Sequence, residues 1–430
     1  MNLLNWLPIP VFLFLVYLLW RSVKGSRQDL VFWSALGFKL GCGLAFGWLY
    51  RNYLGLGDTW YHHEITIQVT DLAKADATAY LRFLFLDDVG VLQLPWKPFY
   101  NSFFFLKPTS LLYLLSGNSY WWASFFLSLF SFWGCWFLVQ RLRRYFPDYG
   151  FAATVAFLFF PSVVFWTSGF SKDSLFMGSM CFTIGLVLQL ARREGGNSWQ
   201  QFLLLIVCIW LFWRVKFFLA AVLLVLLSTY VVVQELARRI HWLHAKASQV
   251  VTYFLLLSLG AFLASFLHPT FTLNFFLKHL LYNYNNLLAI SDPAKPILHL
   301  AYLEPTLWSV LVNAPQALWQ MLFRPFVWEP APLFYKLAAV ENLGLLVLVL
   351  AAVIHQAVTR RLPKLPSFVA VLLLFFVLAG VLVALPTPNL GSLFRYRAPL
   401  LPFFLLVIIA WGPLPGWWQK WTGSTAKDKG

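Results

Sequence analysis

The chain has 430 residues, of which 60% are apolar and only 11% are charged. Soluble domains carry about 25% charged residues, so this composition excludes a soluble globular protein and predicts an all-α polytopic membrane protein. The formal net charge of +16 does not indicate a nucleic-acid partner, because in a membrane protein the distribution of basic residues matters more than their sum.

A membrane-spanning helix needs about 20 mostly apolar residues. About eleven stretches of the chain predict crossings on this ground, and residues 1–430 would then form a single transmembrane domain. The stretches are 3–20, 30–50, 119–140, 150–170, 174–190, 201–213, 217–234, 250–267, 337–358, 368–385 and 395–411. The stretch 201–213 is the weakest, because it ends after 13 residues at Arg214. It either crosses together with the next stretch or forms a re-entrant hairpin with it.

Basic residues follow alternate apolar stretches, as in RLRR at 141–144 and TRRLPK at 359–364. The short connections on this side, with the C-terminal tail, hold 17 Lys and Arg against 5 Asp and Glu, a net charge of +12. The opposite side holds 14 against 11, or +3, and Lys39 inside a span completes the total of +16. Short basic loops stay in the cytoplasm, so we expect the N-terminus outside and the C-terminus inside.

Two long segments, residues 51–118 and 268–336, fall on the predicted outer side. Both are half apolar, rich in Trp, Tyr and Phe, and interrupted by Pro. Aromatic rings are favoured at the membrane surface, so we expect helices lying along the interface in both outer loops. Any chemistry of the protein is expected on this face.

The first outer loop begins with the sequence GLGDTWYHHE at 55–64. Asp58 could cap a helix that starts at Thr59, in an otherwise solvated loop. His62, His63 and Glu64 could suggest a metal, but adjacent histidines point in different directions on a helix and the usual i, i+4 pair is missing. A divalent ion is left open but is not indicated.

A second pair of carboxylates follows in the same loop, Asp87 and Asp88 in FLDDVG. A turn is the simpler interpretation of this pair, with general acid or base chemistry as the alternative. The four cysteines, in contrast, fall inside apolar stretches without metal-ligand spacing, so we interpret them as packing residues. They are Cys42, Cys135, Cys181 and Cys208.

The segment SGFSKDS at 168–174 separates two apolar stretches and is predicted to be the outer turn of a helical hairpin. Asp173 near the start of the following helix is favoured by the helix dipole, whereas Lys172 at the same end is not. A cation beside the free amides of a helix N-terminus makes an anion site, and a bound phosphate would account for both residues.

Further cations are predicted on the same side, in FRPFVWEP at 323–330 and LFRYRAP at 393–399. Arginine binds phosphate oxygens in a bidentate way. Each of Arg324, Arg395 and Arg397 could instead extend to the membrane surface as an isolated charge. Several cations above one set of spans nevertheless favour a membrane lipid with a phosphate headgroup as their common partner.

The order of these features resembles the C-fold class of membrane glycosyltransferases (GT-C), which includes the protein mannosyltransferases of glycosyltransferase family 39 and the aminoarabinose transferases. The shared features are the early Asp58 in the first outer loop, interfacial helices, a bundle of spans and a late outer loop. The segments PSVVFWTSGFSKDSL, FRPFVWEP and LFRYRAPLLPF also look like those of bacterial membrane proteins grouped with these enzymes. The resemblance covers roughly residues 30–410. The stretch 3–20 is an extra span relative to the family, and no second acidic residue lies beside Asp58.

The resemblance implies a GT-C-like fold in the bacterial cytoplasmic (inner) membrane and an active site on the periplasmic face. A sugar would pass from a polyprenyl-phosphate donor to a hydroxyl of a glycan, lipid or protein acceptor, with inversion and without a nucleotide sugar. Asp58 would be the general base, and His62 or Glu64 would orient it or the acceptor. The donor phosphate would be held by Lys172, Arg324, Arg395 and Arg397, with Arg214 and Lys216 in reserve.

Three other functions share some of these features. A lipid-linked glycan polymerase or ligase would use the same lipid phosphate and the same outer loops. A lipid or solute transporter would place ionisable groups near the middle of the membrane and break matching helices in two repeated halves. Lys39 is the one strong charge in the middle of a predicted span. A non-catalytic membrane protein would leave the clustered outer cations unexplained.

Overall fold

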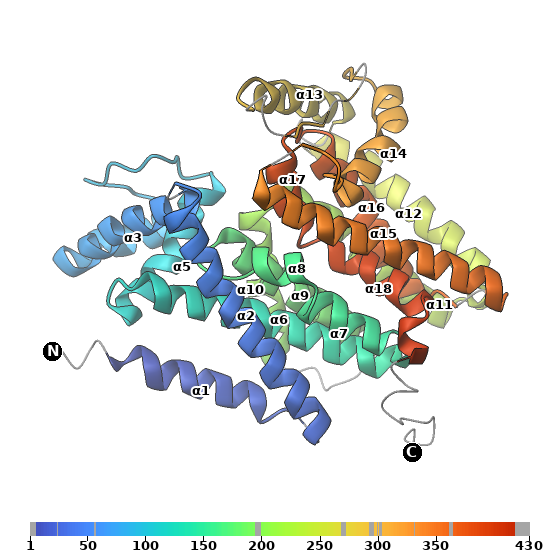
Figure 1. The fold of residues 1–430 in the computed structure, drawn as a ribbon, viewed down its shortest axis with the longest axis horizontal. Helices are drawn as coiled ribbons and strands as arrows, with labels where there is room; N and C mark the ends of the chain where they lie inside the picture. Colours follow the sequence, from blue (N-terminus) through green and yellow to red (C-terminus); the bar gives the residue numbers. More distant parts are fainter. Residues whose placement is uncertain are drawn as a thin grey trace. The chain divides into compact units, whose positions relative to one another are not determined.

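A computed structural model gives the fold of the chain (Figure 1). It describes residues 6–23, 25–55, 57–193, 199–267, 272–291, 296–298, 300, 303–330, 332–360 and 364–417. Residues 3–5 of the first predicted crossing and the C-terminal KDKG at 427–430 lie outside this part of the chain. The predicted site residues all lie within it.

Helices make up the regular structure of the described residues, which confirms the predicted all-α class. The β pairing in this part of the chain is a single antiparallel bridge between Ile297 and Asn389. Because helices satisfy their own backbone hydrogen bonds, they are the structure expected of apolar stretches of this length in a bilayer.

Seven of the described helices are long and apolar enough to cross a membrane by length and composition. A bent pair, α17 (Leu390–Arg397) and α18 (Leu401–Trp411), adds an eighth candidate. These candidates are compatible with a multi-pass membrane protein. The other predicted crossings correspond to short or broken helices, so the number eleven stays a prediction. They are α1 (Pro8–Trp20), the pair α7 (Gly150–Leu158) and α8 (Pro161–Trp166), and α10 (Trp199–Val215).

Proline accounts for both breaks. Pro161 starts α8 after a gap of two residues from the end of α7, and Pro402 occupies the first turn of α18. A proline lacks the amide hydrogen and clashes with the preceding turn, so it is tolerated at the start of a helix and interrupts one elsewhere. The two segments of the bent pair meet at an angle of 66°.

The chain divides into two compact units. The first takes the described residues up to Gln140, Phe157–Leu186, and the described part of Gly196–Ala220. Besides α1, α8 and α10, it contains α2 (Ser26–Asn52), α3 (Gly57–Ala75), α4 (Ala77–Leu86), α5 (Asn101–Ser116), and most of α6 (Tyr120–Tyr145) and α9 (Lys172–Ala191).

In the first unit, α3 packs on both α4 and α5, and Figure 1 shows α3 beside α5. Asp76 begins α4 by accepting hydrogen bonds from the amides of Thr78 and Ala79 at 2.9 and 3.0 Å, and Gly117 ends α5 in the left-handed conformation. Their shared core holds buried apolar side chains from all three helices. These are Ile65, Val69, Tyr80, Phe83, Phe103 and Leu106.

Helices α6 and α9 approach closely because glycines face each other. A Cβ atom added to Gly134 would overlap the carbonyl oxygen of Gly178. Next to this contact, the Sγ atoms of Cys135 and Cys181 lie 3.9 Å apart as free thiols in a fully buried contact. Small residues at such contacts let helix backbones come together in a membrane.

The second unit holds the rest of the described chain and is all helical. Besides α7, α17 and α18, its elements are the 3-10 turns η2 (Pro147–Tyr149) and η3 (His241–His244), most of α11 (Phe217–Arg239), α12 (Lys246–Leu267), α13 (Leu273–Ala289), α14 (Leu307–Phe323), α15 (Leu333–Thr359) and α16 (Ser367–Ala384). Helix α16 packs on both α14 and α18, and α15 packs on α14 and α18. The predicted outer loops thus contain helices α3–α5 and α13–α14, as expected. Their position at a membrane surface stays a prediction.

Candidate functional site

The turn between α8 and α9 is held by its own hydroxyl groups. Gly169 has a φ of +77°, a conformation that glycine adopts without strain, and its amide donates to Ser128 Oγ of α6 at 2.8 Å. Ser174 Oγ donates back to the Gly169 carbonyl at 2.9 Å, and the Ser174 amide donates to Ser171 Oγ at 3.1 Å. The serines of this segment therefore fix the start of α9.

The buried Lys39 supports this turn from α2. Its ammonium donates to Thr167 Oγ1 at 2.6 Å, and the side chain is 3% exposed. Thr167 Oγ1 in turn donates to the Val163 carbonyl at 2.6 Å. Lys39 lies in the middle of a candidate span, where an ionisable group needs a polar partner. In this structure the partner belongs to the turn that precedes Lys172.

Helix α9 begins at Lys172, two residues before the predicted stretch 174–190, and each of its first two residues has a specific partner. Lys172 Nζ donates to Ser102 Oγ in the first turn of α5 at 2.9 Å. Asp173 Oδ1 lies 2.8 Å from Lys216 Nζ, and its side chain is 3% exposed. Asp173 is thus stabilised by both the helix dipole and an ammonium group.

Two further cations come from the end of α10. Arg214 Nη2 donates to the Pro98 carbonyl at 3.4 Å, and its guanidinium lies 5.1 Å from the centre of the Phe104 ring. Lys216 Nζ lies 4.7 Å from the centre of the Phe176 ring. Such stacking on aromatic faces stabilises cations that have left bulk water.

We refer to Lys172, Asp173, Arg214 and Lys216 as the basic cluster. Three cations and one carboxylate give it a formal charge of +3 − 1 = +2. It gathers the start of α9, the end of α10 and the start of α5, and Asn101 Nδ2 donates to the Val215 carbonyl at 3.2 Å to hold α5 on α10. All four side chains are half-buried or buried, so their charges act in a poorly solvated place.

Asp58 lies in the first turn of α3, and its side chain is exposed. The helix starts at Gly57, one residue before the aspartate rather than after it. The hydroxyl of the next residue, Thr59, donates a hydrogen bond to the Phe170 carbonyl at 2.6 Å. The same Thr59 Oγ1 atom lies 2.9 Å from the Tyr120 hydroxyl. Phe170 is two residues before Lys172, so the start of α3 is bonded to the segment that carries the basic cluster.

His62 and His63 face different surroundings. His62 is 3% exposed, its Nδ1 is hydrogen-bonded to the Asp58 carbonyl, and its ring stacks on Trp96 at 4.4 Å. His63 is half-buried, its Nδ1 is hydrogen-bonded to the Tyr113 hydroxyl, and its ring meets that of Tyr120 edge-on.

Burial and the nearby charge of Arg51 lower the pKa of His63, so the ring is favoured in its neutral form. Glu64, the remaining predicted orienting residue, is exposed. Across the described ranges, no group of three His, Cys, Asp or Glu side chains is arranged to hold a metal ion.

The carboxylates of FLDDVG have local partners. Asp87 ends α4 with a φ of +59° and lies 2.5 Å from Lys107 Nζ, while Asp88 Oδ1 accepts from the Gly90 amide at 3.0 Å. This arrangement confirms the interpretation of the segment as a turn.

In the second unit, Arg324 and Arg397 both bind protein groups at the end of α14. Arg324 forms a two-pronged ion pair with Glu329, with Nε–Oε1 at 2.8 Å and Nη2–Oε2 at 2.7 Å. Arg397 is 0% exposed, and its Nη1 donates to the carbonyls of Met321 and Leu322 at 2.6 and 2.7 Å.

These carbonyls lack partners within the helix, so Arg397 caps α14. Its Nη2 also donates to Asn342 Oδ1 and lies 3.6 Å from Glu341 Oε1. Arg395, in the last turn of α17, is half-buried.

Within the first unit, the structure brings Lys172 together with Arg214 and Lys216, and bonds their segment to the first turn of α3. Within the second unit, it gathers Arg324 and Arg397 around α14. Ser102 is a site residue that the sequence did not single out. Its partner Lys172 is 70 residues away in the chain, and no local pattern marks it.

Comparison of the chain with family models, curated proteins and solved structures finds no match in any of the three.

Proposed function

We propose that the protein is a membrane glycosyltransferase that moves a sugar from a polyprenyl-phosphate-linked donor to an acceptor hydroxyl on the outer face of the bacterial cytoplasmic membrane. The observation that carries the proposal is the basic cluster, at the start of α9 and bonded through Phe170 and Thr59 to the segment with Asp58. A carboxylate next to a site for an anionic leaving group is what such a transfer requires.

The basic cluster suits the departing lipid phosphate. Its formal charge of +2 matches the two negative charges that a phosphate monoester carries when fully ionised. Lys172 and Lys216 supply ammonium donors, and Arg214 supplies a planar guanidinium group that can donate two parallel hydrogen bonds to a phosphate. We therefore assign the phosphate to these three residues first. Arg324, Arg395 and Arg397 stay candidates, although Arg324 and Arg397 already donate to groups of the protein.

The reaction balances as a single displacement. Asp58 accepts the proton of the acceptor hydroxyl, whose oxygen forms a bond to the anomeric carbon of the sugar. The bond from that carbon to the phosphate oxygen breaks on the opposite side, which inverts the anomeric centre, and polyprenyl phosphate leaves with the bonding electrons. His62 holds the backbone of Asp58 in place, because its ring nitrogen Nδ1 is hydrogen-bonded to the backbone carbonyl of Asp58. The scheme uses only side chains of the protein, and a divalent ion is not indicated.

Native mass spectrometry of the purified protein with added polyprenyl phosphate tests the site. Lys172→Met keeps the aliphatic stem and removes the charge, so retention should fall at least about tenfold, the loss expected for one charge-assisted contact. Arg82→Met is the matched control, because Arg82 is an exposed cation on α4 of the same unit. Equal retention by Lys172→Met and the wild-type protein would overturn the assignment.

A lipid or solute transporter is the second candidate, and Lys39 is the observation that favours it, because ionisable groups within spans mark transport paths. The contact between Lys39 and Thr167 also supports the turn before Lys172, so the transferase accounts for it as well. Liposomes that hold the protein and a fluorescent polyprenyl phosphate distinguish the two. Movement of the lipid between leaflets without any sugar transfer would favour the transporter.

A further inference from the structure

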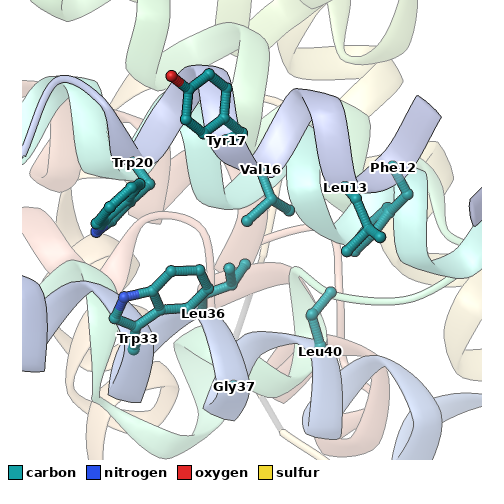
Figure 2. Close-up of a pocket in the computed structure, with 9 residues that line it drawn as sticks. All are labelled: Phe12, Leu13, Val16, Tyr17, Trp20, Trp33, Leu36, Gly37 and Leu40. Atoms are coloured by element: carbon teal, nitrogen blue, oxygen red, sulfur yellow. The ribbon is translucent and has the colours of Figure 1, made fainter. Parts of the chain in front are cut away.

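An apolar groove runs between α1 and α2 in the first unit. Its cavity volume is about 460 Å³. Figure 2 shows Leu13, Val16 and Trp20 of α1 on one side and Trp33, Leu36 and Leu40 of α2 on the other. The groove is open along its length and is lined almost entirely by hydrocarbon and aromatic rings.

Helix α1 packs on its neighbours along its length, and its side chains Val16 and Leu19 are only 6% and 3% exposed. Near its start, the ring of Phe12 packs on those of Trp122 and Phe126 in α6 at 6.2 and 5.7 Å. At its end, Trp20 lies 6.3 Å from Trp33 between ring centres, and its indole nitrogen donates to Asp29 Oδ1 at 3.0 Å. Figure 2 shows Phe12 at one end of the groove and Trp20 and Trp33 at the other.

A glycine forms the floor of the groove. Gly37 of α2 is among the lining residues, and a Cβ atom added there would meet no other atom within 4 Å. When such a space is empty, the side chains that line it lack partner atoms and lose dispersion contacts. Between two apolar helices of a membrane protein, a lipid hydrocarbon chain is the filling that makes those contacts.

One end of the groove carries an exposed cation. Arg21 directly follows Trp20 and is exposed, whereas the carboxylate of Asp29 at the same end accepts a hydrogen bond from the Trp20 indole. The paired indoles of Trp20 and Trp33 at this end are the side chains favoured at the level of lipid headgroups. The guanidinium of Arg21 suits the phosphate headgroup of an anionic lipid.

We propose that the groove between α1 and α2 binds one acyl chain of an anionic phospholipid, whose phosphate lies at Arg21. The bound chain completes the packing of α1 on α2, the helix pair that begins the chain. The inference is independent of the proposed transferase activity, because neither the basic cluster nor Asp58 lines the groove.

Photolabelling of the full chain in lipid nanodiscs tests the site. The probe is phosphatidylglycerol with a diazirine in one acyl chain, and labelled peptides are mapped by mass spectrometry. We expect label on residues 12–20 and 33–40. Gly37→Leu fills the groove with its own side chain, so label there should fall roughly tenfold through the lost apolar contacts.

Gly41→Leu is the matched control. Gly41 is exposed on the same helix, does not line the groove, and has the same open space around its α-carbon. Label should stay at the wild-type level in this variant. Equal labelling of Gly37→Leu and the wild-type protein would mean that only loosely associated lipid is detected, and would overturn the proposal. Cross-links between two copies of the chain through the groove in place of lipid label would overturn it as well.

The headgroup is tested with the corresponding phosphatidylcholine probe. Phosphatidylglycerol should label the groove several-fold more strongly, and Arg21→Gln should remove this preference through loss of the charge-assisted contact with phosphate. Equal labelling by both probes in the wild-type protein would reject the anionic headgroup.

Discussion

Lys216 Nζ lies 2.8 Å from Asp173 Oδ1, and this ion pair joins the end of α10 to the start of α9. The side chain of Asp173 is 3% exposed and that of Lys216 is 19% exposed. The pair is therefore partly withdrawn from water, and each charge depends on the other. A variant that lacks one partner keeps an unpaired, poorly solvated charge, which lowers stability. A variant that lacks both partners keeps no such charge.

The first prediction concerns this pair. Lys216→Met and Asp173→Asn should each lower the free energy of unfolding by about 1–3 kcal/mol, less than a fully buried pair because Lys216 reaches solvent. The double variant should lose clearly less than the sum of the two. Thermal melting in detergent measures all three, and additive losses would show that the charges are not coupled.

The second prediction concerns Asp58. Asp58→Asn should reduce transfer from a polyprenyl-phosphate sugar by about 10²–10⁴-fold through loss of the base. Its melting temperature should not change, because the side chain is exposed. Glu64→Gln, an exposed carboxylate on the same helix, should lose much less activity. Full activity of Asp58→Asn would remove this residue from the mechanism.

The third prediction concerns the contact of α6 with α9. Gly134→Ala should destabilise the protein by about 1–3 kcal/mol, because the added methyl group meets the backbone of Gly178 and neither helix can yield freely. Gly41→Ala is the control, since its methyl group meets nothing within 4 Å. It should be neutral or slightly stabilising, as alanine is the better helix former. A melting temperature for Gly134→Ala as high as that of the control would contradict the close packing.

The fourth prediction follows from Glu329. Burial alone would raise its pKa, but the hydrogen bonds from Arg324 and the Phe326 amide, with the charge of Arg324, outweigh burial and lower it. A carboxyl whose folded pKa is depressed stabilises the protein above its unfolded value, and this stability is lost as the pH falls. The melting temperature should therefore drop between pH 7 and pH 4 by more in the wild-type protein than in Arg324→Gln. Parallel curves would show that the pair does not contribute.

The fifth prediction follows from His63, whose pKa lies below the ordinary 6.5 because of burial and Arg51. The unfolded chain then binds this proton more readily than the folded one, so stability is lost as the pH falls through 6.5 toward the folded value. His63→Gln cannot titrate. Its stability relative to the wild-type protein should improve from pH 8 to pH 5.5, as measured by thermal melting. A constant difference would show that His63 does not couple folding to protons.

The fold class and the ends of many helices could be predicted, because they depend on local composition. Apolar stretches became helices, and α9 begins at Lys172, within two residues of the predicted stretch 174–190. Prolines set the breaks at Pro161 and Pro402, yet a stretch of suitable composition does not show whether it remains one straight helix.

Partners across the fold could not be predicted. Ser102 is 70 residues from Lys172, and nothing in either segment points to the other. Arg397 shows the same limit in a different way. An arginine at the start of a span looks alike in sequence whether it binds a phosphate or, as found, the carbonyls at the end of α14. Only the packing of α14 against α17 decides between the two.

The contact between Lys39 and Thr167 also bears on how the protein is made. The ribosome adds Lys39 to the chain 128 residues before Thr167. Until then, a lysine near the centre of α2 has no hydroxyl partner, and its transfer into lipid costs about 2.5–3.5 kcal/mol. We expect α2 to stay beside the insertion machinery, or to enter the bilayer only provisionally, until α8 emerges. Biogenesis of the first unit would then be timed by the buried ammonium group of Lys39.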